Sequence, residues 1–218
     1  MKFFSLASKI LLLLVGMETF ALAGPTILET IPEDPSPDSR FVFYLHGKII
    51  EDKGREAEHP RFGKYEYDAI LEALAARGYV VISEQRKPKT NVGAYGRKVM
   101  EQIGVLLGKG VPPEQISVVG FSKGGMIALS VSARLKAPIR YVLLAHCPRR
   151  GVTVKAQGQV LAIREASDLS VTSCVPLFER SPRLQAHNEL ELEIGGGHGA
   201  FFKPQEAWLE PTFEWIEK

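Results

Sequence analysis

The chain has 218 residues, with 27 lysines and arginines against 25 aspartates and glutamates, so its formal net charge is only +2. A balance this close to neutral gives no support to a nucleic-acid partner. The two cysteines and five histidines do not cluster at the spacing of metal ligands, so we expect no metal site. The length suits a single domain with a substantial core.

The first 23 residues have the pattern of an export signal. Lys2 and Lys9 lead into the apolar run 10–15, and residues 21–23 form a small-x-small cleavage site. The apolar run is too short to span a bilayer, and no cysteine follows the site to carry a lipid. We therefore expect a periplasmic or secreted protein that has no stable membrane anchor once the signal is removed. The alternative is an uncleaved amphipathic helix.

The predicted domain occupies residues 40–218, after an extended, proline-containing lead-in at 24–39 with one short strand at 26–30. Further strands are predicted at 41–45, 79–83, 116–119, 139–145, 159–163 and 190–194. Helices are predicted at 67–77, 95–107 and 124–135. Short apolar strands that alternate with helices predict an α/β fold, with a mainly parallel sheet covered by helices on both faces. Glutamates alternate with apolar residues in the last strand, as is typical of an edge strand.

The most informative stretch runs from Ile116 to Leu129, where an apolar strand leads into Gly-Phe-Ser-Lys-Gly and then into a helix. Gly120 and Gly124 lack the Cβ atoms that would clash at so tight a turn, so the hydroxyl of Ser122 stands clear of the sheet edge. The free N–H groups at the start of the helix favour a developing negative charge. This pattern predicts a nucleophilic serine. The alternative is a glycine-rich turn that cradles a phosphate.

Two more candidates follow strands at the same, carboxyl edge of the predicted sheet. Asp168 lies just beyond the strand at 159–163, and His198 lies in a glycine-rich loop after the last strand. The order Ser, acid, His, together with Gly-x-Ser-x-Gly, resembles the α/β-hydrolase superfamily over residues 40–215. The resemblance implies that Ser122 is the nucleophile, Asp168 the acid and His198 the general base. It also implies acyl transfer through a covalent intermediate, without a cofactor.

The resemblance extends to an oxyanion-binding loop. His46-Gly47 is similar to the corresponding loop of the family, which implies that the backbone N–H groups of Lys48 and Lys123 are the two oxyanion donors.

Alternatives remain for the acid and the base. Asp168 is also a preferred type of helix N-cap, and Glu165, which stands where the family often has glycine, is its main rival. His146, which ends another strand, is the reserve base, and we place it behind the reacting groups.

Cys147 and Cys174 are the two cysteines of the chain. In an oxidising export compartment we expect them to pair, and the alternative is two separate buried thiols.

Only 45 residues separate Ser122 from Asp168, and a strand and its return take up most of them. We therefore expect no cap domain and an open site. Such a site suits an ester or thioester of a small molecule, or an acyl group on a larger carrier. An amidase or peptidase with the same triad is a second hypothesis. A non-catalytic binding protein is a third.

Basic residues follow several of the predicted strands, with Glu51, Asp52 and Glu84 opposing them. The basic residues are Lys48, Arg86, Lys87, Lys123, Arg149 and Arg150. We assign Arg86 and Arg149 to binding of an anionic substrate, and the alternative is a solvated rim of mixed charge.

Overall fold

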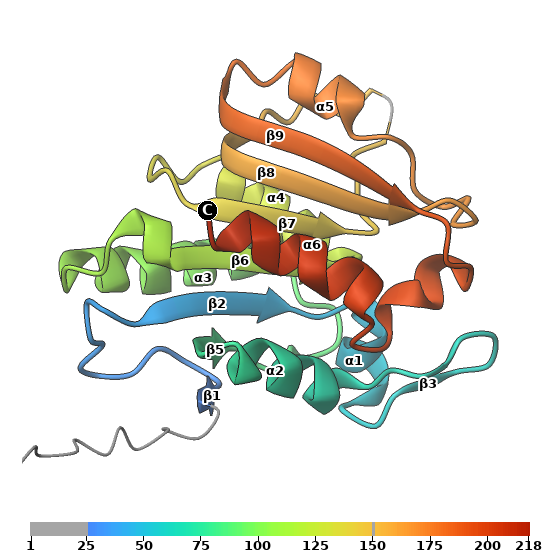
Figure 1. Cartoon of the computed structure of the whole chain (residues 1–218), viewed down its shortest axis with the longest axis horizontal. Coiled ribbons are helices and arrows are strands. Elements are labelled where there is room, and N and C mark those ends of the chain that lie inside the picture. The colour runs from blue at the N-terminus through green and yellow to red at the C-terminus, as the bar shows by residue number, and fades with distance from the viewer. Residues whose placement is uncertain (1–25, 150) are drawn as a thin grey trace, which may run out of the picture.

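The computed structural model describes residues 26–149 and 151–218, and the predicted export signal lies outside them. Seven strands form one sheet in the order β1-β5-β2-β6-β7-β8-β9, and every neighbouring pair is parallel (Figure 1). The strands are β1 (Thr26–Leu28), β2 (Arg40–Leu45), β5 (Tyr79–Ile82), β6 (Ile116–Phe121), β7 (Arg140–Leu144), β8 (Gln157–Glu165) and β9 (Arg183–Leu192). The predicted α/β fold with a mainly parallel sheet is confirmed.

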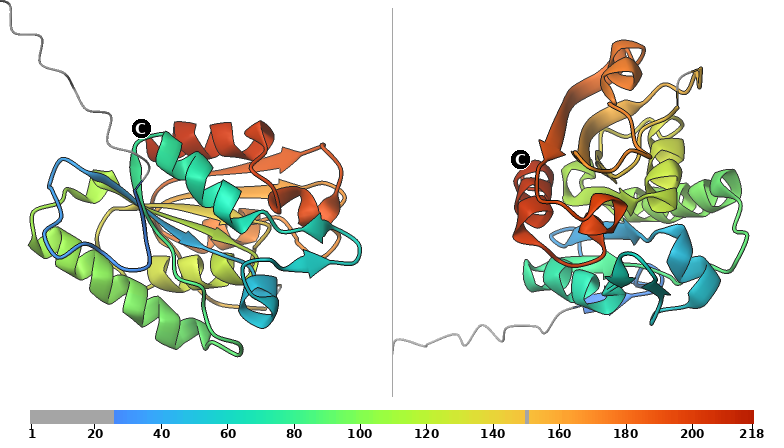
Figure 2. Two further views of the ribbon diagram at one scale, coloured as in Figure 1. Left: turned by 90° about the horizontal axis from the view of Figure 1, so that it is seen from below. Right: turned by 90° about the vertical axis from the view of Figure 1, so that its right-hand side faces the viewer.

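Helices cover both faces of this sheet, as Figure 2 shows from below. On one face lie α2 (Tyr67–Ala76) and α6 (Glu206–Ile216), and on the other lie α3 (Val92–Gly108) and α4 (Lys123–Ser132). The central strands β2, β6 and β7 are therefore buried almost throughout, which explains their continuous apolar sequences.

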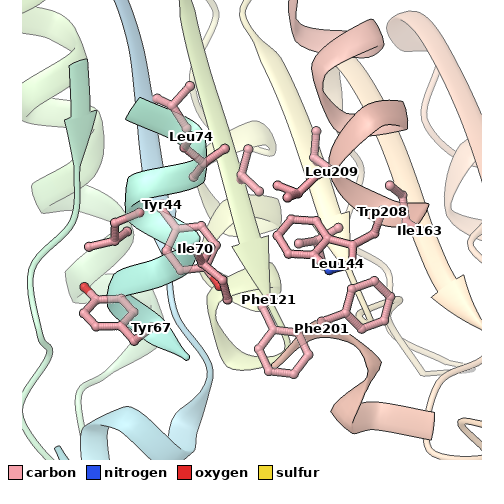
Figure 3. Packing of buried hydrophobic residues seen from close by; sticks show 14 of the residues in the cluster. Tyr44, Tyr67, Ile70, Leu74, Phe121, Leu144, Ile163, Phe201, Trp208 and Leu209 are labelled. Atoms are coloured by element: carbon pink, nitrogen blue, oxygen red, sulfur yellow. The ribbon is translucent and has the colours of Figure 1, made fainter. Parts of the chain in front are cut away.

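The core between the sheet and the pair α2 and α6 is rich in large side chains (Figure 3). Leu144 and Ile163 of the sheet lie beside Trp208 of α6, and Ile70 of α2 lies beside Tyr44 of β2; all five are essentially inaccessible to solvent. Burial of an aliphatic or aromatic side chain of this size contributes about 1.5–3 kcal/mol. The core thereby fixes the sheet whose carboxyl edge carries the candidate site.

Local sequence signals set the helix ends. The side chain of Asn91 caps α3 by accepting a hydrogen bond of 2.9 Å from the N–H of Ala94. Gly78 follows α2 with a φ of +83°, a left-handed conformation that glycine adopts without strain.

The strand predicted in the lead-in is confirmed: β1 forms at Thr26–Leu28 and pairs with β5. At the opposite edge the sheet is longer than the sequence pattern predicts. β9 starts at Arg183 and ends at Leu192, whereas the alternating pattern predicts only 190–194. Its polar first half is held by backbone pairing with β8, and hydrogen bonds of that kind leave no mark in the side-chain pattern. The prediction that the last strand lies at an edge is confirmed.

Short elements decorate the carboxyl edge of the sheet, which faces the viewer in the right panel of Figure 2. They are α1 (Lys48–Lys53), the two-strand hairpin of β3 (Glu58–His59) and β4 (Gly63–Lys64), α5 (Val175–Glu179) and η2 (Gly197–Phe201). The hairpin was not predicted. Its Phe62 packs on Phe202, with ring centroids 5.7 Å apart, so the hairpin rests against the segment that carries His198. A further short helix, η1 (Pro113–Gln115), lies away from this edge, directly before β6.

Between Ser122 and Asp168 the described residues contain α4, β7 and β8 and no lid helix. None of the helices in residues 26–149 and 151–218 is long and apolar enough to cross a membrane.

The predicted disulfide between Cys147 and Cys174 is present, with the two Cα atoms 5.2 Å apart. Both residues are buried, and the bond ties the loop after β7 to the residue before α5. It therefore cross-links two segments that lead away from the carboxyl edge of the sheet.

Reduction of this disulfide is expected to lower the free energy of unfolding by about 3–4 kcal/mol, because the bond closes a loop of 27 residues in the unfolded chain. Urea unfolding of the oxidised protein, the reduced protein and the Cys147→Ser/Cys174→Ser variant measures this difference. Equal stability of all three would contradict a stabilising role for the bond.

Candidate active site

Ser122 lies on a strained turn between β6 and α4. Its φ of 53° and ψ of −112° are costly for a residue with a side chain, by about 1–3 kcal/mol. Two backbone hydrogen bonds hold the turn: the N–H of Ser122 donates to the Leu144 carbonyl at 2.9 Å, and the N–H of Met126 donates to the Ser122 carbonyl at 3.1 Å. The structure therefore presents the hydroxyl at the edge of the sheet, as the sequence predicts.

The glycines on either side of Ser122 are required by close backbone packing. A Cβ on Gly124 would overlap the backbone carbonyl of Leu45, at the end of β2. A Cβ on Gly120 would overlap the backbone of Gly124. The first turn of α4 thus packs directly against the end of the neighbouring strand, which only glycine allows.

The three residues predicted as a triad lie in one line of hydrogen bonds. Nε2 of His198 is 2.8 Å from Oγ of Ser122, and Nδ1 of His198 is 2.6 Å from Oδ2 of Asp168. A neutral imidazole with its proton on Nδ1 satisfies both contacts, because Nδ1–H donates to the carboxylate and Nε2 accepts from the serine hydroxyl. In this tautomer Nε2 is ready to take the proton of Ser122.

The carboxyl of Asp168 is held in its ionised form. Burial of the group opposes ionisation, but hydrogen bonds from Ser170 and His198 outweigh it and lower the pKa of Asp168. Oδ1 accepts from the hydroxyl of Ser170 at 2.5 Å and from its backbone N–H at 3.1 Å. An ionised Asp168 stabilises the positive charge that His198 gains when it takes a proton.

Glu165, the rival acid, has a different position. Its carboxylate is buried and accepts hydrogen bonds from the N–H of Ser167 at 2.9 Å and the N–H of Gly195 at 3.0 Å. Glu165 therefore joins the loop that carries Asp168 to the loop that carries His198. It supports both residues and does not contact the imidazole.

His146, the reserve base, lines the same open cavity as Ser122 and His198, but the hydrogen-bond partner of the Ser122 hydroxyl is His198. Burial, and to a smaller extent the nearby His198, lowers the pKa of His146 to about 4, so its imidazole is neutral at physiological pH. A Cβ on Gly125 of α4 would come within 2.6 Å of the Cβ of His146, which shows how tightly this histidine packs against the helix.

The loop at 46–48 lies beside the serine. A Cβ on Gly47 would be 3.8 Å from the Cβ of Ser122 and 2.9 Å from the ring of Phe121. Lys48 begins α1 and Lys123 begins α4, and the first N–H groups of a helix have no carbonyl of their own helix to bind. The two backbone N–H groups predicted as oxyanion donors thus start two helices that meet next to Ser122.

His46 is fully buried beneath this loop in its neutral form. Its Nδ1 is 2.8 Å from the Gly47 carbonyl, and its Nε2 accepts from the backbone N–H of Arg86 at 3.0 Å. Burial, followed by the positive charge of Arg86, lowers the pKa of His46 to about 3. The imidazole therefore serves as a fixed support for the loop.

The assignment of Arg86 to substrate binding is wrong. Its side chain is fully buried, and its Nε lies 2.8 Å from Oε1 of Glu51, which is also fully buried. Oε2 of the same carboxylate lies 2.5 Å from Nζ of Lys123, whose side chain is 14% exposed. A charged guanidinium inside the protein needs a buried counter-ion, and Glu51 supplies it. The sequence pattern placed Arg86 and Glu51 on an open rim, because a sequence does not show which charged side chains face the interior.

An open cavity of about 770 Å³ adjoins Ser122 and His198. Arg149 lines it, as predicted, and so does Arg134, which the sequence analysis missed. Apolar walls come from residues of α4 and of the loops after β7 and β8, namely Met126, Leu129, Val152, Val154 and Val171. Arg150, also predicted at this rim, lies outside the described residues.

The charge of the cavity is positive. Of the described residues that line it, four are lysine or arginine and none is aspartate or glutamate. Lys48 and Lys123 are paired with Asp52 and Glu51, whereas the described residues offer no carboxylate within ion-pair distance of Arg134 or Arg149. Arg134 follows the end of α4, and its Nη1 donates a hydrogen bond of 3.0 Å to Oγ of Ser130 on that helix.

No protein-family model matches the sequence, and no curated protein matches it at a significant level. Among solved structures, the chain is similar to the esterase Pf2001 of Pyrococcus furiosus, with a TM-score of 0.54 and 18% identity over 84% of each chain. It is also similar to a YdeN-like hydrolase of Pectobacterium atrosepticum, with a TM-score of 0.53 and 14% identity over 82% of this chain and 91% of that one.

A thermostable esterase gives a TM-score of 0.51 at 14% identity, and the match covers 86% of this chain but only 57% of that longer one. At these identities the likeness concerns the fold. The parallel sheet, the turn at Ser122 and these neighbours agree, and the chain has the α/β-hydrolase fold that its sequence predicts.

Proposed function

We propose that the protein is a serine hydrolase that cleaves a carboxylic ester or thioester through an acyl-enzyme intermediate. One observation carries the proposal: an unbroken line of hydrogen bonds joins Asp168, His198 and Ser122, and it ends at a strained turn whose hydroxyl borders an open cavity.

In the proposed reaction His198 takes the proton of Ser122 at Nε2 while Oγ attacks the carbonyl carbon of the substrate. The carbonyl oxygen becomes an oxyanion, and the N–H groups of Lys48 and Lys123 donate hydrogen bonds to it. Collapse of this intermediate expels the alcohol or thiol, which leaves with the proton from His198. Water then repeats the sequence on the acyl-enzyme, with His198 again as base, and releases the carboxylic acid.

The shape and lining of the cavity support this reaction. Its apolar walls suit the acyl part of an ester, and its open form suits substrates that enter without a lid. Two of the similar structures are named esterases, which agrees with the proposal. An amidase would use the same triad, and the described residues do not separate the two leaving groups. A binding protein would have no need of an aligned general base.

Export to the periplasm or the exterior remains a second part of the proposal. The disulfide supports it, because such bonds persist in oxidising compartments. The export signal itself lies outside the described residues.

A fluorophosphonate probe is expected to label Ser122 covalently, and both Ser122→Ala and His198→Ala are expected to abolish labelling. Mass spectrometry of the labelled peptide identifies the residue. Labelling that persists in Ser122→Ala, or no labelling of the folded wild-type protein, would overturn the proposed function.

Asp168→Asn is expected to lower kcat by about 10⁴-fold, because the imidazole then loses its ionised partner and its correct tautomer. Glu165→Gln removes a charge that accepts hydrogen bonds from two loops and does not contact the imidazole. It is therefore expected to lower the free energy of unfolding, while the turnover of each labelled site stays within a few-fold of the wild-type value. Turnover normalised to fluorophosphonate-labelled sites separates the two effects. The reverse ranking would make Glu165 the acid.

The cationic residues of the cavity predict a preference for anionic esters. An ester with a carboxylate at the far end of its acyl chain is expected to have a kcat/KM about fivefold above that of its carboxamide analogue at low salt, and the preference should shrink as ionic strength rises. Arg134→Gln combined with Arg149→Gln should remove the preference and spare the neutral ester.

The matched control for that experiment is Arg183→Gln, which removes an exposed arginine at the start of β9, outside the lining of the cavity. Equal cleavage of the two esters by the wild-type protein at low salt would assign the arginines to a solvated rim.

A further inference from the structure

The buried carboxylate of Glu51 connects the two halves of the proposed oxyanion site. Glu51 belongs to α1, one turn after Lys48, and its Oε2 lies 2.5 Å from Nζ of Lys123, the first residue of α4. The N–H groups of Lys48 and Lys123 come from these two different helices, which are far apart in the sequence. The ion pair is therefore a direct tie between their first turns.

The same carboxylate also supports the loop that begins at His46, through Arg86. Its Oε1 lies 2.8 Å from Nε of Arg86, and a second nitrogen of Arg86 donates to the carbonyl of His46. The backbone N–H of Arg86 donates to His46 as well. The side chains of Glu51 and Arg86 are completely buried, so solvent does not weaken these contacts.

We propose that Glu51 is a positioning residue, which fixes the spacing between the two oxyanion donors by pairing with Lys123 and Arg86 at once. This inference rests on the proposed function. The donors must lie within hydrogen-bond distance of an oxygen that carries full charge only during the reaction, so a small change in their spacing weakens the transition state more than the bound substrate. Loss of the tie should therefore lower kcat and leave KM nearly unchanged.

The net charge of the three side chains offers a competing explanation. One carboxylate and two cations leave a charge of +1 beside the oxyanion, and this charge alone would favour the reaction. The two explanations predict opposite signs for one substitution. Glu51→Gln raises the local charge to +2 and cuts the tie, whereas Lys123→Met lowers the charge to zero and also cuts the tie. Both substitutions keep every backbone N–H group.

The experiment compares Glu51→Gln, Lys123→Met and the double variant with the wild-type protein. Lys123→Met leaves the buried carboxylate paired with Arg86, so this variant is the one expected to keep its stability. We measure kcat and KM for a neutral ester, and the rate constant of inactivation by a fluorophosphonate, all per labelled site. Lys98→Met is the matched control, because it breaks an exposed ion pair with Glu84.

If the tie positions the donors, both single variants should lose about 10- to 100-fold in kcat and in the inactivation rate, with KM within about twofold. The double variant should be no worse than the poorer single one, because each change removes the same contact. A kcat in Glu51→Gln at or above the wild-type value overturns the proposal, and so does an unchanged kcat per labelled site in Lys123→Met. Wild-type protein that resists labelling would instead refute the proposed hydrolase.

Discussion

The contact between the start of α4 and the end of β2 sets the geometry of the site. Gly124 packs so closely on the carbonyl of Leu45 that no side chain fits between them. This packing forces the strand-to-helix turn into the strained conformation of Ser122 and brings the first turn of α4 next to the loop that begins at His46. The strain at Ser122 is sustained because the parallel sheet fixes both strands from either side.

A fold of this kind supplies the catalytic groups from loops that are far apart in sequence, so their mutual positions need further support. Two buried carboxylates give it. Glu165 accepts hydrogen bonds from the loops that carry the acid and the base, and Glu51 joins the two helices that begin at the proposed oxyanion donors. Each carboxylate is buried and connects two segments that are far apart in the sequence.

Burial of Glu51 also affects the charge of the open cavity beside Ser122. Its charge compensates Lys123 and Arg86, so the cations left without a carboxylate partner among the described residues that line the cavity are Arg134 and Arg149. A cavity with apolar walls and two guanidinium groups that lack a carboxylate partner attracts anions more selectively than a rim of mixed charge does. In the proposed function, the position of this one carboxylate thus affects both the support of the oxyanion donors and the charge that a substrate meets.

The sequence by itself determined the α/β fold, the central strands and the turn at Ser122, because apolar periodicity and the spacing of glycines are local signals. The sequence also indicated His198, through the family resemblance in the order of serine, acid and histidine. It left Asp168 and Glu165 as rivals and placed Arg86 on the surface. Only the tertiary structure decided these points, since two carboxylates three residues apart are distinguished by the directions in which the backbone places their side chains. Burial of a charge likewise depends on a partner such as Glu51, 35 residues away in the chain, which no local pattern identifies.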